Sequence, residues 1–398
     1  MKWTRTKLGE FAPFVYGKGL PQSTRIEGDI PVYGSNGIVG RHSEALVKEP
    51  AVIIGRKGSV GAVHLSKGQS WPIDTAFFAL GSKDVDLNFL YYLLKTLPIT
   101  SNSDSAVPGL NRDFAHSIEI RVPEIRGQVT IGEILANIDT KISANENLSG
   151  TLEEIAQTIF KSWFIDFDPV KAKMEGEHAT DMDAETASFF PDSMEESELG
   201  LIPKGWEVRS LDEISEYLNG LAMQKFPVID ENAQLPVVKI AQLRVGNTQG
   251  ADMASALLEP KFIIKDGDIL FSWSGTLEVE NWAGGPGALN QHLFKVTGKT
   301  VPDWYSYLST KSFLSFFRGI ASGKATTMGH IQRGHLTESK LAIPNLELMN
   351  RATEIIEPII ALKTKTSVES RLLAEIRDSL LPRLISGALQ IPEEMLAS

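Results

Sequence analysis

Short apolar runs that lead into turn residues occupy the first third of the chain. Residues 30–33, 51–54 and 76–80 are rich in Val, Ile and Phe, and the first two runs are followed by glycine-containing turns. Such runs predict β-strands. Residues 87–97 form a longer apolar stretch, which predicts a buried helix.

The same order of elements returns in the second half of the chain. Residues 236–240, 268–273 and 292–296 predict strands, and a helix is expected near 304–317. This mixture of strands and helices indicates an α+β fold. Because one order of elements is used twice, the chain is expected to contain two domains of the same type.

Two further segments have a helical period. Between 124 and 164, and again between 347 and 386, apolar residues recur at alternating steps of three and four or at their multiples. A helix of about 40 residues would span roughly 60 Å. Pro358 and Pro382 lie inside the second segment, and we expect each to kink or interrupt that helix.

The centre of each apolar stripe is polar. Asn145 and Ser149 occupy it in the first segment, and Thr366 and Ser370 hold the matching places in the second. A polar layer in a helix pair fixes the register of the two helices at a cost in stability. Because the chain returns through a domain, the helices are expected to pair as an antiparallel coiled coil.

The two halves also match residue by residue. Trp3-Thr4-Arg5-Thr6-Lys7-Leu8 resembles Trp206-Glu207-Val208-Arg209-Ser210-Leu211 at an offset of 203 residues. Val122-Pro123 matches Ile343-Pro344 at an offset of 221, and this offset then holds through the helical segments. The increase places insertions in the middle of the second copy, where surface loops tolerate extra length. The period is far longer than the roughly 20–50 residues of a solenoid repeat.

These patterns divide the chain into two domains, two helices and a linker. The expected bounds are domain 1 at 1–123, helix 1 at 124–165, an acidic linker at 166–203, domain 2 at 204–343, and helix 2 with a C-terminal tail at 344–398. Seven apolar residues are candidates for the helix seam or for docking a partner: Ile138, Leu148, Leu152, Ile159, Ile359, Leu373 and Leu380.

The charge of the chain is distributed unevenly. The net charge is −11, but residues 124–200 carry 5 Lys and Arg against 17 Asp and Glu, whereas residues 1–123 carry 14 against 11. The acidic excess therefore lies in the first helix and the linker, which we expect to be an irregular connector ordered by a few aromatic residues. Binding to a polyanion depends on the local charge of a surface, so the total neither requires nor excludes DNA.

Composition narrows the class of protein further. The chain has no cysteine, which excludes disulfides and thiolate chemistry and is consistent with a reducing compartment. Residues 1–11 lack the apolar core of a secretory signal, and no run approaches the roughly 20 apolar residues of a membrane span. A cytoplasmic protein is expected.

Several motifs in their joint order resemble one known family. They are Tyr33-Gly34-Ser35-Asn36-Gly37, Leu110-Asn111-Arg112, Trp163-Phe164-Ile165-Asp166-Phe167-Asp168-Pro169-Val170, Ile202-Pro203-Lys204-Gly205-Trp206-Glu207-Val208 and Thr326-Thr327-Met328-Gly329-His330-Ile331-Gln332. With the duplication and the proline-started helices, they make the chain similar to the specificity subunits of type I restriction-modification systems. The resemblance covers essentially the whole chain.

The resemblance carries several expectations. Each domain would be a target-recognition domain that reads one half of a split double-stranded DNA site, and the two helices would set the distance between the halves. Two methyltransferase subunits and the restriction subunits would be partners. S-adenosylmethionine would be bound by the methyltransferase subunit, so no cofactor, no metal and no catalytic residue is expected in this chain.

Polar residues near the predicted strand ends are candidates for DNA contact. Arg can bind guanine and Asn or Gln can bind adenine through two hydrogen bonds, each pair contributing about 1–3 kcal/mol of discrimination. The candidates in domain 1 are Ser35, Asn36, Arg56, Lys57, Ser59, Asn111 and Arg112. Those in domain 2 are Gln242, Arg244, Ser274, Asn290, Gln291, His330, Gln332 and Arg333. For any one of these loops, an ordinary hairpin turn with solvated polar residues is the alternative.

The loops themselves differ between the copies. Arg56-Lys57-Gly58-Ser59 corresponds to Trp273-Ser274-Gly275-Thr276, and Asp74-Thr75-Ala76 corresponds to Asn290-Gln291-His292. Different loops on one scaffold are what an asymmetric split target requires, although neutral divergence after duplication is the alternative.

Catalytic readings have weaker support. The Gly-x-x-Gly-x-x-Gly stretches at 34–40 and 55–61 are neither a dinucleotide fingerprint nor a Walker loop. Pro302-Asp303 with Glu338 and Lys340 formally resembles a metal-nuclease motif, but the first copy lacks it. Two other functions stay open: a coiled-coil adaptor that joins two protein partners without DNA, and the specificity module of a methylation-only system.

Overall fold

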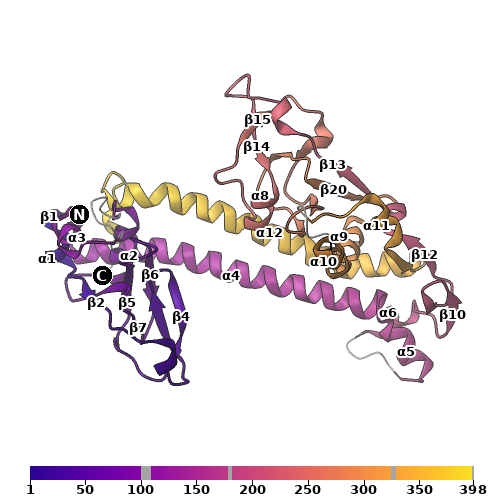
Figure 1. Cartoon of the computed structure of the whole chain (residues 1–398), viewed down its shortest axis with the longest axis horizontal. Helices are drawn as coiled ribbons and strands as arrows, with labels where there is room; N and C mark the ends of the chain where they lie inside the picture. Colours follow the sequence, from indigo (N-terminus) through magenta and orange to yellow (C-terminus); the bar gives the residue numbers. More distant parts are fainter. Residues whose placement is uncertain (100–108, 178–181, 324–328, 397–398) are drawn as a thin grey trace. The chain divides into compact units, whose positions relative to one another are not determined.

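The computed structural model describes residues 1–99, 109–177, 182–323 and 329–396 of the chain (Figure 1). Two compact units account for them: unit 1 contains Met1–Lys141 and Leu373–Ser398, and unit 2 contains Ile142–Leu372. Each unit therefore combines one predicted domain with part of each long helix.

Unit 1 is built around two small sheets. One sheet has the strand order β2-β8-β5-β6, and the other has the order β4-β3-β7, in which β3 and β7 run parallel. A two-stranded sheet of β1 and β9 joins the two ends of the domain. The strands are β1 Trp3–Lys7, β2 Val15–Tyr16, β3 Ile30–Gly34, β4 Gly37–His42, β5 Ala51–Gly55, β6 Val63–Ser66, β7 Trp71–Pro72, β8 Ala76–Leu80 and β9 Glu119–Pro123.

Unit 2 repeats this topology with more residues. Its larger sheet has the order β13-β20-β17-β18, and β14 and β19 form the second parallel pair, with β15 and β16 at the edges. The pair β12-β21 takes the place of β1-β9. The strands are β12 Glu207–Ser210, β13 Ser215–Asn219, β14 Gln234–Val238, β15 Met253–Ser255, β16 Ile263–Ile264, β17 Ile269–Ser272, β18 Val279–Asn281, β19 Gly287–Leu289, β20 Leu293–Gly298 and β21 Lys340–Ile343. The predicted α+β class and the predicted duplication are confirmed.

Short helices pack on these sheets in equivalent places. In unit 1 these are α1 Leu8–Phe11, α2 Leu87–Thr96 and α3 Arg112–Ser117. In unit 2 they are α7 Leu211–Ile214, α8 Ile240–Val245, α9 Asp303–Ser312, α10 Leu314–Gly323 and α11 Arg333–Glu338. The helix expected near 304–317 is therefore two helices, α9 and α10, because the chain turns at Phe313.

Each long segment forms one helix of 40 residues, α4 Ile125–Phe164 and α12 Leu346–Ile385. The prediction that Pro358 and Pro382 interrupt the second helix was wrong. Pro358 lies on the exposed side of α12, and Ile356 and Ile360 beside it are buried. Packing on both sides of the proline therefore holds the helix where one backbone hydrogen bond is missing.

Within unit 2 the two long helices contact each other in antiparallel order. Asn145 Nδ2 donates to Glu369 Oε2 at 2.9 Å, and the hydroxyls of Ser149 and Ser367 are 3.0 Å apart. The predicted polar layer is therefore present at Asn145 and Ser149. Thr366 is buried as well, and its hydroxyl donates to Leu362 O of the same helix at 2.7 Å. The supercoiled geometry of a coiled coil stays a prediction.

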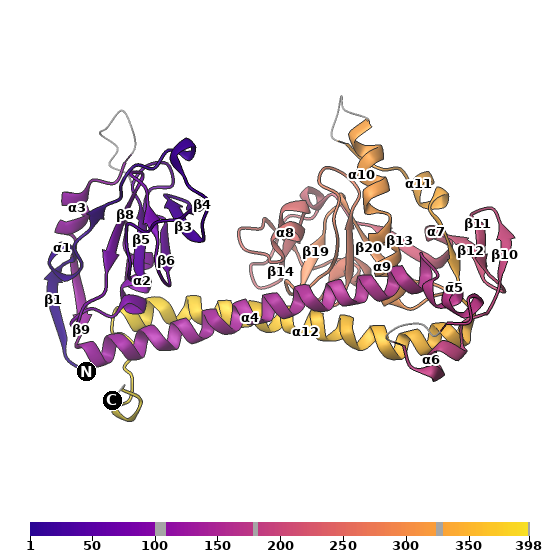
Figure 2. The ribbon, with the colours of Figure 1, turned by 90° about the horizontal axis from the view of Figure 1, so that it is seen from below.

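The acidic linker is more ordered than we expected. It contains α5 Asp168–Met174, α6 Ala184–Ser188 and a hairpin of β10 Met194–Ser197 with β11 Gly200–Pro203, which Figure 2 shows beside the end of α4. Phe190 is buried and its ring packs edge-on against Trp163 at 5.4 Å. Phe190 and Val170 belong to the hydrophobic core of unit 2, so burial of apolar side chains orders the linker in spite of its charge.

Candidate nucleic-acid interface

In each unit, loops from different parts of the chain meet at one end of the larger sheet. We call these clusters tip 1, residues 56–59, 74–75 and 111–112, and tip 2, residues 273–276, 290–292 and 332–333. The same backbone hydrogen bond closes both: Leu110 N donates to Arg56 O at 2.8 Å, and Ile331 N donates to Trp273 O at 3.0 Å. The structure therefore brings most of the predicted contact residues of each domain together.

Two arginines enclose Tyr16 at tip 1. The guanidinium carbons of Arg56 and Arg112 lie 5.0 and 5.1 Å from the centre of the Tyr16 ring, which is 46% exposed. Arg56 also donates from Nη1 to the backbone oxygen of Asp74 at 3.0 Å. Each cation–π contact contributes about 0.5–1 kcal/mol at an exposed site. Tip 1 thus holds two positive groups around an exposed aromatic ring.

Other predicted residues of domain 1 surround this cluster. Asn36, Lys57 and Ser59 are exposed, and Ser35 is half-buried in the turn between β3 and β4. A Cβ atom at Gly55 would lie 2.8 Å from the backbone oxygen of Ser35. Glycine at this position therefore allows the β3–β4 turn to approach the loop that carries Arg56 and Lys57.

Asn111 has a structural task at the same place. Its side-chain oxygen accepts hydrogen bonds from Asp113 N at 2.8 Å and Phe114 N at 3.0 Å, which caps the N-terminus of α3. An N-cap of this kind contributes about 1 kcal/mol. The cap explains why asparagine stands there without DNA, and a contact between Asn111 and DNA stays a prediction.

His116 connects α3 to the segment before β2. Its Nε2 atom accepts a hydrogen bond from Phe14 N at 2.8 Å, and the two rings pack edge-on at 5.3 Å. Burial, followed by the positive charge of Arg112, lowers the pKa of His116. A neutral imidazole therefore supports the helix that carries Arg112.

Tip 2 is aromatic where tip 1 is cationic. The ring of Trp273 lies 5.9 Å from the rings of His292 and Phe294 and 6.4 Å from His330, and its Nε1 donates to Asn219 Oδ1 at 3.0 Å. Trp273 occupies the place that Arg56 holds in unit 1. The two tips therefore present different chemical groups on the same strand ends.

The predicted polar residues of tip 2 are partly enclosed. Ser274 and Asn290 are only 3% and 2% exposed, and Ser274 Oγ is 3.0 Å from His292 Nδ1. Asn290 Nδ2 donates to Gln291 Oε1 at 2.7 Å. Gln291 and His330 are half-buried. Side chains held in this way shape the surface, and whether any of them reaches a base stays a prediction.

The start of α11 carries the exposed residues of tip 2. Gln332 is the N-cap residue, and its backbone N–H donates to His335 Nδ1 at 3.1 Å. Arg333 lies 5.5 Å from the centre of the Phe294 ring and donates from Nη2 to Tyr217 O at 3.1 Å. It stands 221 places after Arg112, at the equivalent position of α11. Of the motif at 326–332, Thr326 to Met328 lie outside the described residues.

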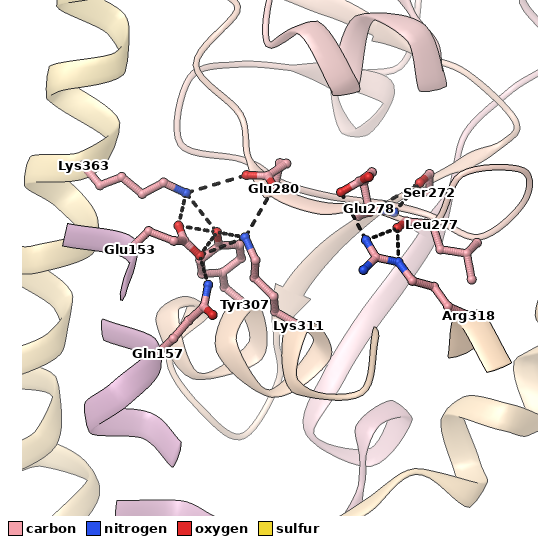
Figure 3. Close-up of polar contacts among 10 residues, drawn as sticks. All are labelled: Glu153, Gln157, Ser272, Leu277, Glu278, Glu280, Tyr307, Lys311, Arg318 and Lys363. Carbon is pink, nitrogen blue, oxygen red and sulfur yellow. Dashed lines mark hydrogen bonds and ion pairs between the residues drawn. The ribbon is translucent and has the colours of Figure 1, made fainter. Parts of the chain in front are cut away.

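Hydrogen bonds and one ion pair stabilise the loop that carries Trp273 and Ser274. Ser272 Oγ donates to Thr276 O at 2.6 Å and accepts from Glu278 N at 2.8 Å. Arg318 of α10 donates from Nη2 to Leu277 O at 2.9 Å and pairs with Glu278 at 3.4 Å (Figure 3). These contacts hold both ends of the turn that carries Trp273 and Ser274.

Two predicted residues lie apart from tip 2. Gln242 and Arg244 belong to α8, and Gln242 Oε1 accepts from Lys239 N at 3.3 Å. Arg244 is exposed and lines a cavity of about 500 Å³ together with Lys363 and Glu280. The structure thus separates these two residues from the cluster in which the sequence pattern had placed them.

The candidate helix residues fall into two groups. Leu152 is buried, and Ile138, Ile159, Ile359, Leu373 and Leu380 are half-buried. Leu148 is 44% exposed, and Leu362 and Leu372 on α12 are 45% and 46% exposed. The exposed group leaves apolar surface on the helices of unit 2.

Sequence reasoning missed Tyr16 as a member of tip 1, and it did not include Trp273 among the candidates for DNA contact. Tyr16 is the second residue of the two-residue strand β2, which gives too short a pattern to detect. Trp273 was compared with Arg56 position by position, and an aromatic residue facing a polar one is a signal that could have identified it.

Two classes of site have no support in the described part of the chain. No group of three or more His, Asp or Glu side chains there is arranged to hold a metal ion. Asp303 and Lys340 of the formal nuclease motif have separate partners: Asp303 Oδ1 accepts from Gly298 N at 2.7 Å, and Lys340 pairs with Glu198 at 2.7 Å.

No helix in the described part of the chain has both the length and the apolar character that crossing a bilayer requires.

Comparison with known proteins points in one direction. Residues 1–154 and 203–377 match the family model for the type I restriction modification DNA specificity domain. The chain is 27% identical to the HindI specificity subunit of Haemophilus influenzae, over 73% of each protein. It is 25% identical to the MjaIX specificity subunit of Methanocaldococcus jannaschii, covering 88% of this chain and 82% of that one. The S subunit of a type I system from M. genitalium has a similar fold, with a TM-score of 0.61 over 97% of this chain and 96% of that one at 15% identity.

Proposed function

The chain belongs to the type I restriction-modification DNA specificity family, and on this basis we propose that it recognises a split, asymmetric DNA target. Unit 1 would read one half-site through tip 1, and unit 2 would read the other through tip 2. The chain would act without catalysing a reaction itself.

One observation carries this proposal: two domains of the same strand order present different side chains at the same end of the sheet. Tip 1 offers Arg56, Lys57 and Arg112, which suit phosphates and guanine edges. Tip 2 offers Trp273 and Arg333, with His330 beside the Trp273 ring, which makes a more aromatic surface with fewer charges. Two different surfaces on one scaffold support the reading of two different base sequences.

The long helices supply the second part of the proposal. Exposed leucines on α4 and α12, such as Leu148, Leu362 and Leu372, are suited to packing against other subunits. These would be two methyltransferase subunits, which would bind S-adenosylmethionine, and restriction subunits that cleave DNA. The helices would also set the gap between the half-sites.

The experiment that tests the function uses the chain together with the methyltransferase subunit encoded beside it. The complex is purified, DNA is exposed to it with S-adenosylmethionine, and methylated adenines are mapped by sequencing. We expect one split motif that disappears when this chain is left out. A stable complex that methylates no defined motif would contradict the proposal and favour a protein adaptor.

A domain exchange then tests the division of labour. Replacing residues 1–123 by the matching domain of a related specificity subunit is expected to change one half-site and to leave the other half-site and the gap intact. Adding residues near Asn145–Ser149 in α4, with matching residues in α12, is expected to change the gap alone. A chimera that alters both half-sites would contradict independent reading.

A further inference from the structure

A buried cluster of charges joins the second domain to both long helices in unit 2. Glu153 of α4 accepts hydrogen bonds from the Tyr307 hydroxyl of α9 at 2.7 and 2.8 Å, and it pairs with Lys311 of α9 at 2.8 Å (Figure 3). Lys363 of α12 pairs with the same carboxylate. Glu280 of β18 completes the cluster, 3.3 Å from Lys311 and 3.7 Å from Lys363.

Three of the four charged side chains of the cluster are largely shielded from solvent, and Glu280 is 36% exposed. The side chains of Glu153, Lys311 and Lys363 are 13%, 18% and 9% exposed. Burial alone would raise the pKa of Glu153, but the positive charges of Lys363 and Lys311 outweigh it and lower that pKa to about 2. Two basic side chains thus face two carboxylates, with Glu153 on the shielded side of the cluster and Glu280 on its more exposed side.

Unit 1 has a smaller cluster of the same chemistry. The hydroxyl of Tyr92 on α2 donates to Asp139 Oδ2 on α4 at 2.5 Å, and Arg377 of α12 donates from Nη1 to Asp139 Oδ1 at 2.6 Å. In both units, therefore, a tyrosine of the domain donates to a carboxylate of α4, and a cation of α12 pairs with that carboxylate. We call each arrangement a polar junction.

The two junctions are not copies of one another. The residue 221 places after Asp139 is Ile360, and the residue 221 places after Glu153 is Ala374. A junction inherited through the duplication would have its second carboxylate on α12, yet both carboxylates lie on α4. The same chemistry thus occurs at non-equivalent positions, which points to a requirement that both units share.

Geometry suggests what that requirement is. The hydrophobic effect that holds a domain against a helix has no direction of its own. A buried ion pair contributes little net stability but is costly to separate, so it specifies one arrangement. Each polar junction ties three elements at once: the domain, α4 and α12.

We propose that Glu153 and Asp139 are positioning residues that fix how each recognition domain is seated on the long helices and thereby restrict the gap between the half-sites. The inference rests on the proposed function. A domain free to shift on the helices by a few ångströms would reach a half-site about one base pair away, since base pairs are spaced by about 3.4 Å.

The test is made on the complex with the methyltransferase subunit. Three variants remove a polar junction: Glu153→Gln, Asp139→Asn, and the double variant Glu153→Gln with Lys363→Met. The double variant leaves Lys311 and Glu280 as a balanced pair and keeps the measurement available if the single change at Glu153 prevents folding. Glu154→Gln is the matched control, because Glu154 is an exposed carboxylate on the same helix.

DNA libraries with the two half-sites at different gaps are methylated, and the rate is compared for each gap. We expect the preference for the correct gap over gaps one base pair longer or shorter to fall at least about tenfold in the junction variants, with unchanged bases in both half-sites. Glu154→Gln should keep the preference of the unaltered chain.

The outcomes separate the two proposals. Junction variants that methylate more slowly but keep the same gap preference would show that the clusters only stabilise the fold, and this would overturn the inference. Absence of any split motif with the unaltered chain would instead overturn the proposed function. Relaxed gap preference in Glu154→Gln as well would also count against the assignment, since that residue takes no part in the junction.

Discussion

Tip 1 and tip 2 stand on equivalent strands of the two units, yet they are stabilised in different ways. At tip 1, Arg56 and Arg112 pack on the exposed ring of Tyr16, and Lys57 and Ser59 project into solvent. At tip 2, Trp273 packs among histidine and phenylalanine rings, and Ser274 and Asn290 are buried. A duplicated scaffold can therefore keep equivalent strand ends while one tip presents cations around an exposed ring and the other presents a half-buried aromatic cluster.

The largest effect is expected where the tips differ in burial. Trp273→Ala should lower the free energy of unfolding by about 3 kcal/mol, because it removes a large ring from an aromatic cluster and leaves Asn219 without its donor. The matched change Arg56→Ala should cost only about 1 kcal/mol, since it removes cation–π contacts and one hydrogen bond at a surface. Urea denaturation measures both. Equal losses would show that the two tips are stabilised alike.

The second comparison uses the equivalent arginines of α3 and α11. Arg112→Ala is expected to weaken discrimination in one half-site by about 1–3 kcal/mol, and Arg333→Ala to do the same in the other. The measurement is the methylation rate on targets altered at each base in turn. Arg112→Lys serves as a control, because lysine keeps the charge but cannot form two parallel hydrogen bonds. Loss of discrimination in both half-sites from either change would contradict separate reading.

A smaller effect is expected from the exposed cation of tip 1. Lys57→Ala should weaken DNA binding about equally for all sequences and reduce the slope of log K against log salt by about one, as for a single phosphate contact. Lys83→Ala is the control, because this exposed lysine follows β8 at the opposite end of the sheet. If both changes reduce the slope equally, tip 1 is not the surface that faces DNA.

The smallest effect concerns pH. It is expected for α3, which contains His116, and not for the equivalent helix α11. Burial and the charge of Arg112 lower the pKa of His116, so the folded chain favours the neutral imidazole. Stability from this group is complete above the unfolded pKa of about 6.5 and declines as the pH falls below that value, until the lowered folded pKa is passed. In unit 2, Thr337 holds the place of His116 and donates to Asp212 at 2.6 Å, so no titration near neutral pH is involved.

Hydrogen exchange at the Phe14 amide, corrected for its intrinsic rate, measures this effect. Protection should decrease as the pH falls below about 6.5 in the unaltered chain. His116→Gln offers an acceptor that does not titrate, and its protection should stay constant over the same range. A decrease of equal size in the glutamine variant would show that His116 is not responsible.

Much of this architecture could be predicted from periodicity. The strands at 51–54 and 76–80, the helix at 87–97 and the long helices follow from apolar patterns that local burial imposes. The matched offsets revealed the duplication, because two copies of one fold need apolar residues at equivalent places. The prediction that Pro358 interrupts the helix was wrong, because packing on both sides of a proline outweighs one missing hydrogen bond.

The candidate site was less predictable. The exposed Lys57 and the half-buried Arg112 could be proposed from residue type and position. That Asn111 caps α3 and that Ser274 is buried became clear only from the fold. Arg244 was grouped with the residues of tip 2, although it belongs to α8 and lines a cavity away from that tip. Residue type indicates which contacts are chemically available, and only the fold decides which partner each side chain meets.

Periodicity and motif order along the chain were enough to predict the class of fold, the duplication, the helical segments and the resemblance to specificity subunits. These depend on spacing along the chain, which is written directly in the order of apolar and polar residues. The folded structure was needed to find that Tyr16 lies between two arginines, that Trp273 replaces a cation with an aromatic cluster, and that each unit has a polar junction on α4. Those contacts join residues separated by tens to hundreds of positions, and no local pattern records which of them will meet.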